Sequence, residues 1–202
     1  MQSKTEVLRM PLSLGAGITG LFLLLTTTSY WETKSETFTF LLFFIGIILV
    51  AIASLGRMWC SLYIAGYKDE KLITSGPYSL CRNPLYFFSM LGIIGVGFST
   101  ETLTFPFILL FLFALYYPVV IRHEERRLEQ FFGPTFIEYK QRVPSFFPKL
   151  SLLEEPRQYV VNPKVYRRHI YNALWFIWVV GFIEVIEGLR EIGLLGSLWA
   201  LY

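Results

Sequence analysis

Long apolar stretches alternate with short polar links along this sequence. An α-helix rises about 1.5 Å per residue, so roughly 20 apolar residues cross a hydrocarbon core of about 30 Å. The apolar stretches predict five membrane-spanning helices, at Leu12–Tyr30, Phe38–Leu55, Leu85–Phe98, Leu103–Ile121 and Ala173–Ile186. The first two and the next two would each form a hairpin, because only short links separate them. The apolar tail, residues 189–202, is too short to cross alone, so it either contributes to a crossing or lies on the membrane.

The polar segments divide the chain into three regions. Residues 1–69 contain the first hairpin and a polar link, and residues 70–149 contain the second hairpin with polar motifs on both sides. Residues 150–202 add one further membrane helix. Lys4 and Arg9 precede the first apolar stretch as in a signal peptide, but no small-residue cleavage site follows it. We therefore expect a retained first helix.

Composition and charge agree with a membrane protein. Hydrophobic residues make up 54% of the chain and charged residues 16%, a balance that is rare in soluble domains. We predict an all-α integral membrane protein with about five transmembrane helices. Of the 18 lysines and arginines, 16 fall on one side of this arrangement: before the first helix, in Gly56–Asn83 and in Arg122–Asn172. Because cytoplasmic loops retain Lys and Arg, these segments and any site built on them are expected to face the cytoplasm.

A scarcity of metal ligands excludes several classes of membrane enzyme. Asp69 is the only aspartate, and His123 and His169 are the only histidines. Di-iron oxygenases need more histidines, metal-dependent phosphotransferases need clustered aspartates, and zinc proteases of the HExxH type need a motif that is absent. Cys60 and Cys81 lack zinc-type spacing and are interpreted as free thiols. We predict no metal and no nucleic-acid partner.

Three glycines, Gly92, Gly95 and Gly97, faintly resemble a nucleotide-binding fingerprint. Such a fingerprint needs a strand before it and a helix after it, and these glycines lie inside an apolar span. Close packing between helices explains them better.

A first polar cluster, Leu72–Tyr86, precedes the third predicted helix. It contains Arg82, two tyrosines and several turn-forming residues. Pro84 suits the first turn of a helix, where its missing N–H has no cost, and Asn83 stands at the N-cap position. A capped helix start with interfacial tyrosines explains this cluster structurally, and a ligand site explains it functionally.

A second polar cluster begins where the fourth predicted helix leaves the membrane. On a helix, Glu124 lies in line with the apolar residues Ile121 and Leu128. A carboxylate in that position is costly unless a cation meets it. The cation is either a side chain, such as Arg127 or Arg82, or a bound ligand.

The neighbouring acidic residues are expected to have a different role. Glu125 and Glu129 fall on the other side of this helix, at pairing distance from Arg122 and Arg126. We predict that these four residues form a solvated face.

The order of these motifs resembles the superfamily of isoprenylcysteine carboxyl methyltransferases and phospholipid methyltransferases. The resemblance covers residues 70–149 and rests on motifs around the second hairpin: Gly76-Pro77-Tyr78, Arg82-Asn83-Pro84-Leu85-Tyr86, Glu124-Glu125, Phe132-Gly133, Tyr139, Arg142-Val143-Pro144 and Phe147-Pro148. Each motif alone is weak, whereas their order and spacing are specific. Asn83 stands where the isoprenylcysteine branch has histidine, which leaves the methyl acceptor open.

The resemblance implies S-adenosylmethionine as methyl donor, bound at the cytoplasmic membrane boundary without a Rossmann domain. Cofactor contacts carry over to Glu70, Lys71, Leu72, Ile73, Tyr78, Asn83, Pro84, Leu85, Tyr86 and Glu124. A carboxylate and aromatic faces suit the sulfonium cation of the donor. Arg82 is our candidate for the carboxylate of the donor, and Arg122, Arg126 or Arg142 for an anionic head of the acceptor. Glu124 and Arg122 are therefore the predicted catalytic residues.

The predicted function is methyl transfer to a lipidic or small hydrophobic acceptor through a carboxylate, amine or thiol. Membrane lipid is the expected surrounding partner. Two alternatives remain at this point. Sterol reductases and related NADPH-dependent membrane enzymes look similar over the same region, and a non-enzymatic scaffold or transport subunit would need no small-molecule ligand. Binding of the cofactor distinguishes the three.

Overall fold

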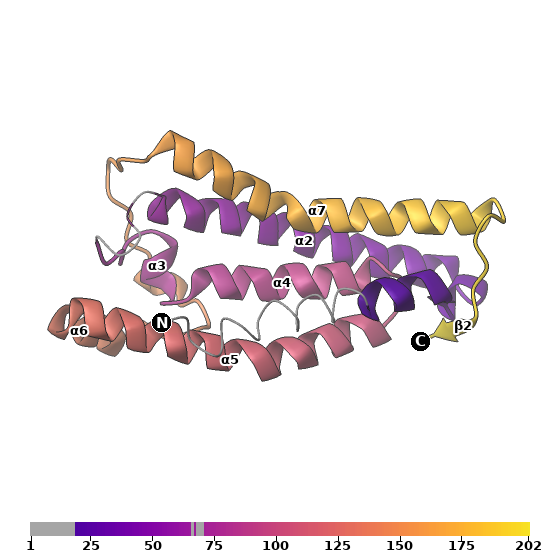
Figure 1. Ribbon diagram of the computed structural model, residues 1–202, viewed down its shortest axis with the longest axis horizontal. Helices are drawn as coiled ribbons and strands as arrows, with labels where there is room; N and C mark the ends of the chain where they lie inside the picture. Colours follow the sequence, from indigo (N-terminus) through magenta and orange to yellow (C-terminus); the bar gives the residue numbers. More distant parts are fainter. Residues whose placement is uncertain (1–18, 66, 68–70) are drawn as a thin grey trace, which may run out of the picture.

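The computed structural model describes residues 19–65, 67 and 71–202, most of which are helical (Figure 1). Its elements in chain order are β1 (Thr27–Ser29), η1 (Trp31–Thr33), α2 (Glu36–Ile64), α3 (Pro77–Leu80), α4 (Pro84–Phe98), α5 (Thr104–Phe132), α6 (Pro134–Arg142), η2 (Leu150–Leu152), α7 (Pro163–Glu191) and β2 (Trp199–Leu201). Residues 19–26, before β1, are also helical. Figure 1 shows α2, α4, α5 and α7 running along one long axis, with α6 at one end and β2 at the other.

The long helices begin where the sequence offers a cap. Ser35 precedes α2, and its side chain accepts a hydrogen bond from the backbone N–H of Phe38. Asn162 precedes α7 and accepts from the first two free N–H groups, while Pro163 occupies the first helical turn. Both caps satisfy N–H groups that have no partner inside the helix.

Among the described residues, three helices are long and apolar enough to cross a membrane: α2, α5 and α7. They correspond to the second, fourth and fifth predicted spans, and each extends beyond the predicted end. The third predicted span is α4, an apolar helix of 15 residues. Part of the first predicted span lies outside the described residues. The rest is helical up to residue 26 and then continues as strand β1. An integral membrane protein is thus supported, and the count of five spans stays a prediction.

The prediction of an all-α chain was wrong in one detail. Strands β1 and β2 pair in parallel, with Thr27 opposite Trp199 and Ser29 opposite Leu201. The carbonyl oxygen of Tyr202 also accepts a hydrogen bond from the backbone of Thr104 at 2.7 Å. The apolar tail therefore turns back from α7 and joins β1 to the link before α5, because its backbone groups find partners there.

Glycines allow α4 to approach its neighbours closely. A Cβ atom on Gly95 would lie 2.8 Å from the carbonyl oxygen of Gly46 in α2. A Cβ atom on Gly92 would lie 2.7 Å from the ring of Phe176 in α7, and one on Gly97 would lie 2.6 Å from the backbone of Pro106 in α5. The packing interpretation of these glycines is confirmed, since each faces a different helix.

Large apolar side chains cover the outside of the bundle. Exposed examples come from each of the three long helices, including Phe40 of α2, Phe107 of α5 and Trp178 of α7. A smaller set of buried side chains, among them Val50 and Phe176, packs α2 against α7. Apolar surface of this extent belongs in lipid rather than in water.

Candidate functional site

The two polar clusters of the sequence meet where α4 begins and α5 nears its end. The hydroxyl of Tyr86, in the first turn of α4, donates a hydrogen bond of 2.6 Å to Oε2 of Glu124 on α5. The ring of Tyr117 lies edge-on to that of Tyr86, with 5.3 Å between centroids, and stacks on Phe113 at 4.0 Å. Glu124 is half-buried, and within the described chain it has no ion pair. A carboxylate beside aromatic rings can accept a cationic ligand.

Glu125 lies in a second, separate network. Its carboxylate pairs with Arg82, at 2.9 Å from Nε to Oε1 and 3.2 Å from Nη2 to Oε2. The amide of Asn83 donates to the same carboxylate at 2.9 Å, and the Ser145 hydroxyl donates at 3.0 Å. The side chains of Arg82 and Glu125 are only 10% and 12% exposed.

The prediction of a solvated face was therefore wrong for Glu125. Successive helical residues point about 100° apart, so Glu124 and Glu125 face different neighbours. The loop before α4 and the segment after α6 cover the side that the sequence suggested would meet water. Glu129 fits the prediction better, because it forms a half-exposed pair with Lys140 at 3.3 Å.

Asn83 stands at the N-cap position of α4, but its side chain makes no capping hydrogen bond. Its Nδ2 donates instead to Glu125 and, at 3.0 Å, to the carbonyl oxygen of Ser145. Pro84 occupies the first helical turn, as predicted. The Arg-Asn-Pro motif thus starts a helix and connects it to α5.

Backbone hydrogen bonds hold the segment after α6 against the first polar cluster. The N–H of Arg82 donates to the carbonyl oxygen of Pro144 at 2.8 Å, and the N–H of Lys149 donates to that of Leu80 at 2.9 Å. The hydroxyl of Tyr139 donates to the carbonyl oxygen of Tyr78 at 2.6 Å. Burial raises the pKa of both tyrosines, so both phenols stay neutral at physiological pH.

Two glycines of the motifs shape this end of the molecule. Gly76 has a φ of 61°, and a Cβ atom there would lie 2.3 Å from the ring of Tyr63. Gly133 has a φ of 51° and lets α5 turn directly into α6. Both conformations are unfavourable for residues with a side chain, which explains Gly-Pro-Tyr and Phe-Gly structurally.

The structure brings together most of the predicted site residues. Tyr78, Arg82, Asn83, Pro84, Leu85, Tyr86 and Glu124 gather where α3, α4 and α5 meet. Leu72 packs against the buried cluster of Phe136, Tyr139 and Val143. Lys71 and Ile73 lie in the loop before α3, Glu70 lies outside the described residues, and Arg122 is exposed on α5.

Sequence reasoning missed two polar residues here. Ser145 completes the network of Glu125. Arg57, in the last third of α2, donates to the Ser89 hydroxyl on α4. Arg57 follows the predicted span Phe38–Leu55 and falls in the polar link Gly56–Asn83, so no local sequence signal set it apart.

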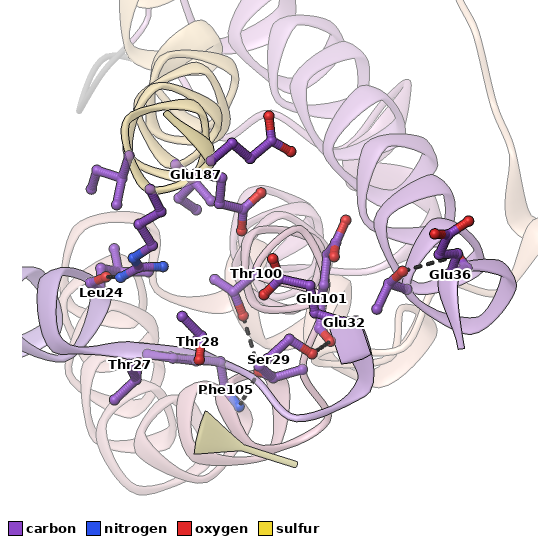
Figure 2. Close-up of a pocket in the computed structure, with 16 residues that line it drawn as sticks. Leu24, Thr27, Thr28, Ser29, Glu32, Glu36, Thr100, Glu101, Phe105 and Glu187 are labelled. Carbon is purple, nitrogen blue, oxygen red and sulfur yellow. Dashed lines mark hydrogen bonds between the residues drawn. The ribbon is translucent and has the colours of Figure 1, made fainter. Parts of the chain in front are cut away.

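A cavity of about 360 Å³ lies at the opposite end of the bundle (Figure 2). Its lining comes from β1, the link between α4 and α5, the start of α2 and the end of α7, and includes Glu32, Glu36, Glu101, Glu187, Glu191 and Arg190. Burial raises the pKa of Glu101 above its ordinary value, and nearby carboxylates add to this effect. None of the predicted site residues that the structure describes lines this cavity.

Two further observations concern the candidate metal ligands and the thiols in the described part of the chain. No group of three or more His, Cys, Asp or Glu side chains there is arranged to hold a metal ion. Cys60 and Cys81 are unpaired and fully buried, and burial raises the pKa of the Cys81 thiol to about 12.

Comparisons with known proteins bear on this site. The family described as phospholipid methyltransferase matches residues 35–135, a range that contains both polar clusters. The cobalt-zinc-cadmium resistance protein CzcN of Cupriavidus metallidurans is 43% identical over 161 residues, which are 80% of this chain and 74% of that protein. The nickel-cobalt-cadmium resistance protein NccN of Alcaligenes xylosoxydans xylosoxydans is 40% identical, over 85% of this chain and 79% of that protein.

A more distant relative is named as an enzyme. Protein-S-isoprenylcysteine O-methyltransferase B of Arabidopsis thaliana is 34% identical over 103 residues, which are 48% of this chain and 50% of that protein. No solved structure matches the chain.

Proposed function

The chain belongs to the phospholipid methyltransferase family, and from this premise we propose that it is a membrane methyltransferase that uses S-adenosylmethionine. The observation that carries the proposal is the hydrogen bond from Tyr86 to Glu124. It joins the two motifs of the family resemblance, which are 38 residues apart, at one end of the helix bundle. We propose that this end faces the cytoplasm, where the soluble donor is available.

The residues around Glu124 fit a sulfonium ligand. Glu124 is half-buried and without an ion pair in the described chain, so its charge is available to a cation. Tyr86 and Tyr117 present aromatic rings beside it. When bound, S-adenosylmethionine supplies an activated methyl group. Glu124 orients the cationic part of the donor, and the tyrosine rings exclude water from it.

The remaining predicted contacts belong to the same proposed site. Tyr78 and the first turn of α4, Pro84 to Tyr86, would line it from one side. The loop residues Lys71 to Ile73 would cover it from the aqueous side, and Glu70, a further predicted contact, lies outside the described residues. Arg82 is already paired with Glu125, so we assign it to holding the site together rather than to the donor.

The acceptor is proposed to be lipidic. Exposed apolar side chains of α5, such as Leu115 and Val119, cover the helix to within about two turns of Glu124. A hydrophobic acceptor can therefore approach laterally from the membrane. Arg122 is exposed on the same helix, where it can hold an anionic head group by charge.

The names of two relatives, both metal resistance proteins, suggest a physiological setting. We propose that methyl transfer by this chain contributes to tolerance of cobalt, nickel or cadmium. A metal-sensitive bacterial strain expressing the wild-type chain should grow at higher metal concentrations than one expressing Glu124→Gln. Equal protection by both would contradict this part of the proposal.

Binding of S-adenosylmethionine, which carries the sulfonium charge, tests the central claim. Calorimetry in detergent should show binding by the wild type and a loss of at least about tenfold in affinity for Glu124→Gln, because a charged contact is removed. The matched control is Glu129→Gln, since the Glu129 pair with Lys140 is half-exposed. Equal affinities of the two variants would refute the role of Glu124. Binding of NADPH instead would favour the reductase alternative, and binding of neither ligand would favour a scaffold.

A further inference from the structure

Arg57 is a cation inside the helix bundle, about two turns before the end of α2. Its Nη1 donates to the hydroxyl of Ser89 on α4, and its Nη2 donates to the carbonyl oxygen of Asn172 on α7 at 3.2 Å. The guanidinium carbon lies 5.5 Å from the centroid of the Phe176 ring. Its Nε is buried and has no hydrogen-bond partner in the described chain.

This arrangement leaves the positive charge without an opposite charge. No carboxylate among the described residues forms an ion pair with Arg57. A buried arginine is usually paired with an opposite charge, and a buried donor is usually satisfied. A purely structural tie between helices would need only neutral donors. The unpaired charge therefore points to an anion that arrives from outside the chain.

Arg57 lies beside the proposed donor site. Ser89, which Arg57 contacts, is one turn after Tyr86 on α4, so the two side chains are neighbours along the helix. The charge of Arg57 is within electrostatic range of the phenols of Tyr78, Tyr86 and Tyr117. Tyr78 is also within range of the carboxylate of Glu124. Tyr78 and Tyr86 are therefore near both Arg57 and Glu124, which form no ion pair with each other in the described chain.

The charges on these two side chains match the amino-acid end of the proposed donor. That end carries a carboxylate beside an ammonium and a sulfonium group. Glu124 offers a negative partner for the cations, whereas Arg82 is occupied by Glu125. We propose that Arg57 binds the α-carboxylate of the methyl donor, which rests on the proposed function. Arg57 then sets the position of the donor relative to Glu124 and discriminates ligands by their carboxylate.

The experiment compares S-adenosylhomocysteine with its decarboxylated analogue, in which only the carboxylate is missing. Wild-type protein in detergent should bind the intact ligand at least about tenfold more tightly, as expected for a charge-assisted pair. Arg57→Gln should bind both ligands alike, at the weaker affinity. Arg57→Lys keeps the charge but loses the planar fork, so it should retain part of the preference.

The matched control is Arg190→Gln, at the opposite end of the bundle. Arg190 also has a buried Nε without a hydrogen-bond partner among the described residues, and it also donates to a backbone carbonyl, that of Leu24. This variant should keep the full preference. A thermal melt of each variant identifies loss of folding, and if Arg57→Gln does not fold, the comparison rests on Arg57→Lys.

The outcomes separate the inference from the proposed function. The inference is overturned if folded Arg57→Gln still prefers S-adenosylhomocysteine to the decarboxylated analogue. It is also overturned if the substitution lowers the affinity for both ligands by the same factor, because Arg57 then does not bind the carboxylate. An unchanged preference in folded Arg57→Lys overturns it as well. Wild type that binds S-adenosylhomocysteine without preferring it to the analogue overturns the inference alone. Wild type that binds neither ligand overturns the proposed function together with the inference.

Discussion

Replacing Glu125 by alanine tests the network at the start of α4. The substitution removes the carboxylate that accepts hydrogen bonds from Arg82, Asn83 and Ser145. It leaves a guanidinium that is only 10% exposed without its counter-ion. Because the network joins α4 to α5, its loss should destabilise the whole bundle rather than one loop.

The expected magnitude follows from burial. Removing one partner of a buried ion pair costs about 3–5 kcal/mol. Arg82 keeps two acceptors, the carbonyl oxygens of Lys140 and Val143, so the lower end of that range applies, about 3 kcal/mol. For a chain of this size each kcal/mol lowers the melting temperature by about 2–4 °C, which predicts a fall of about 6–12 °C.

Two buried thiols can report when the bundle unfolds. Cys60 and Cys81 are fully buried, so a fluorogenic maleimide should react with them only when the bundle opens. A melt in detergent with this dye gives the midpoint for each variant. Glu129→Ala is the control, since a half-exposed pair contributes about 0–1 kcal/mol.

Two results would refute this reasoning. A shift for Glu125→Ala no larger than that for Glu129→Ala would mean that the network contributes no more than a surface pair. Rapid labelling of the wild type at low temperature would mean that the thiols are not buried.

Three further outcomes are expected. Tyr86→Phe should weaken binding of S-adenosylmethionine about tenfold, because Glu124 loses the hydrogen bond that positions it, and should lower the melting temperature by less than Glu125→Ala does; unchanged affinity by calorimetry would contradict this. Gly95→Ala should destabilise the bundle by about 1–3 kcal/mol, since the added Cβ meets the α2 backbone, whereas Gly181→Ala, with open space around it, should be neutral or stabilising in the same melt. Single cysteines at Lys34 and Lys140 should label from opposite sides of the membrane, and labelling from the same side would contradict the predicted topology.

Several features of this protein follow from local sequence. The lengths of the apolar stretches predicted the positions of α2, α4, α5 and α7, because the cost of placing backbone and polar groups in lipid depends on the segment itself. Pro84 predicted the start of α4 for a similar local reason. The order of short motifs indicated the family, which the match over residues 35–135 confirms.

The tertiary structure decided which side chains meet. Helical periodicity placed Glu124 and Glu125 on different faces, but it could not tell which face other segments would cover. Arg82 and Ser145, each at least 20 residues away in sequence, supply the partners of Glu125. The return of the tail to β1 and the unpaired charge of Arg57 likewise depend on contacts between distant segments. Sequence periodicity describes one element at a time, whereas ion pairs, burial and strand pairing are properties of several elements packed together.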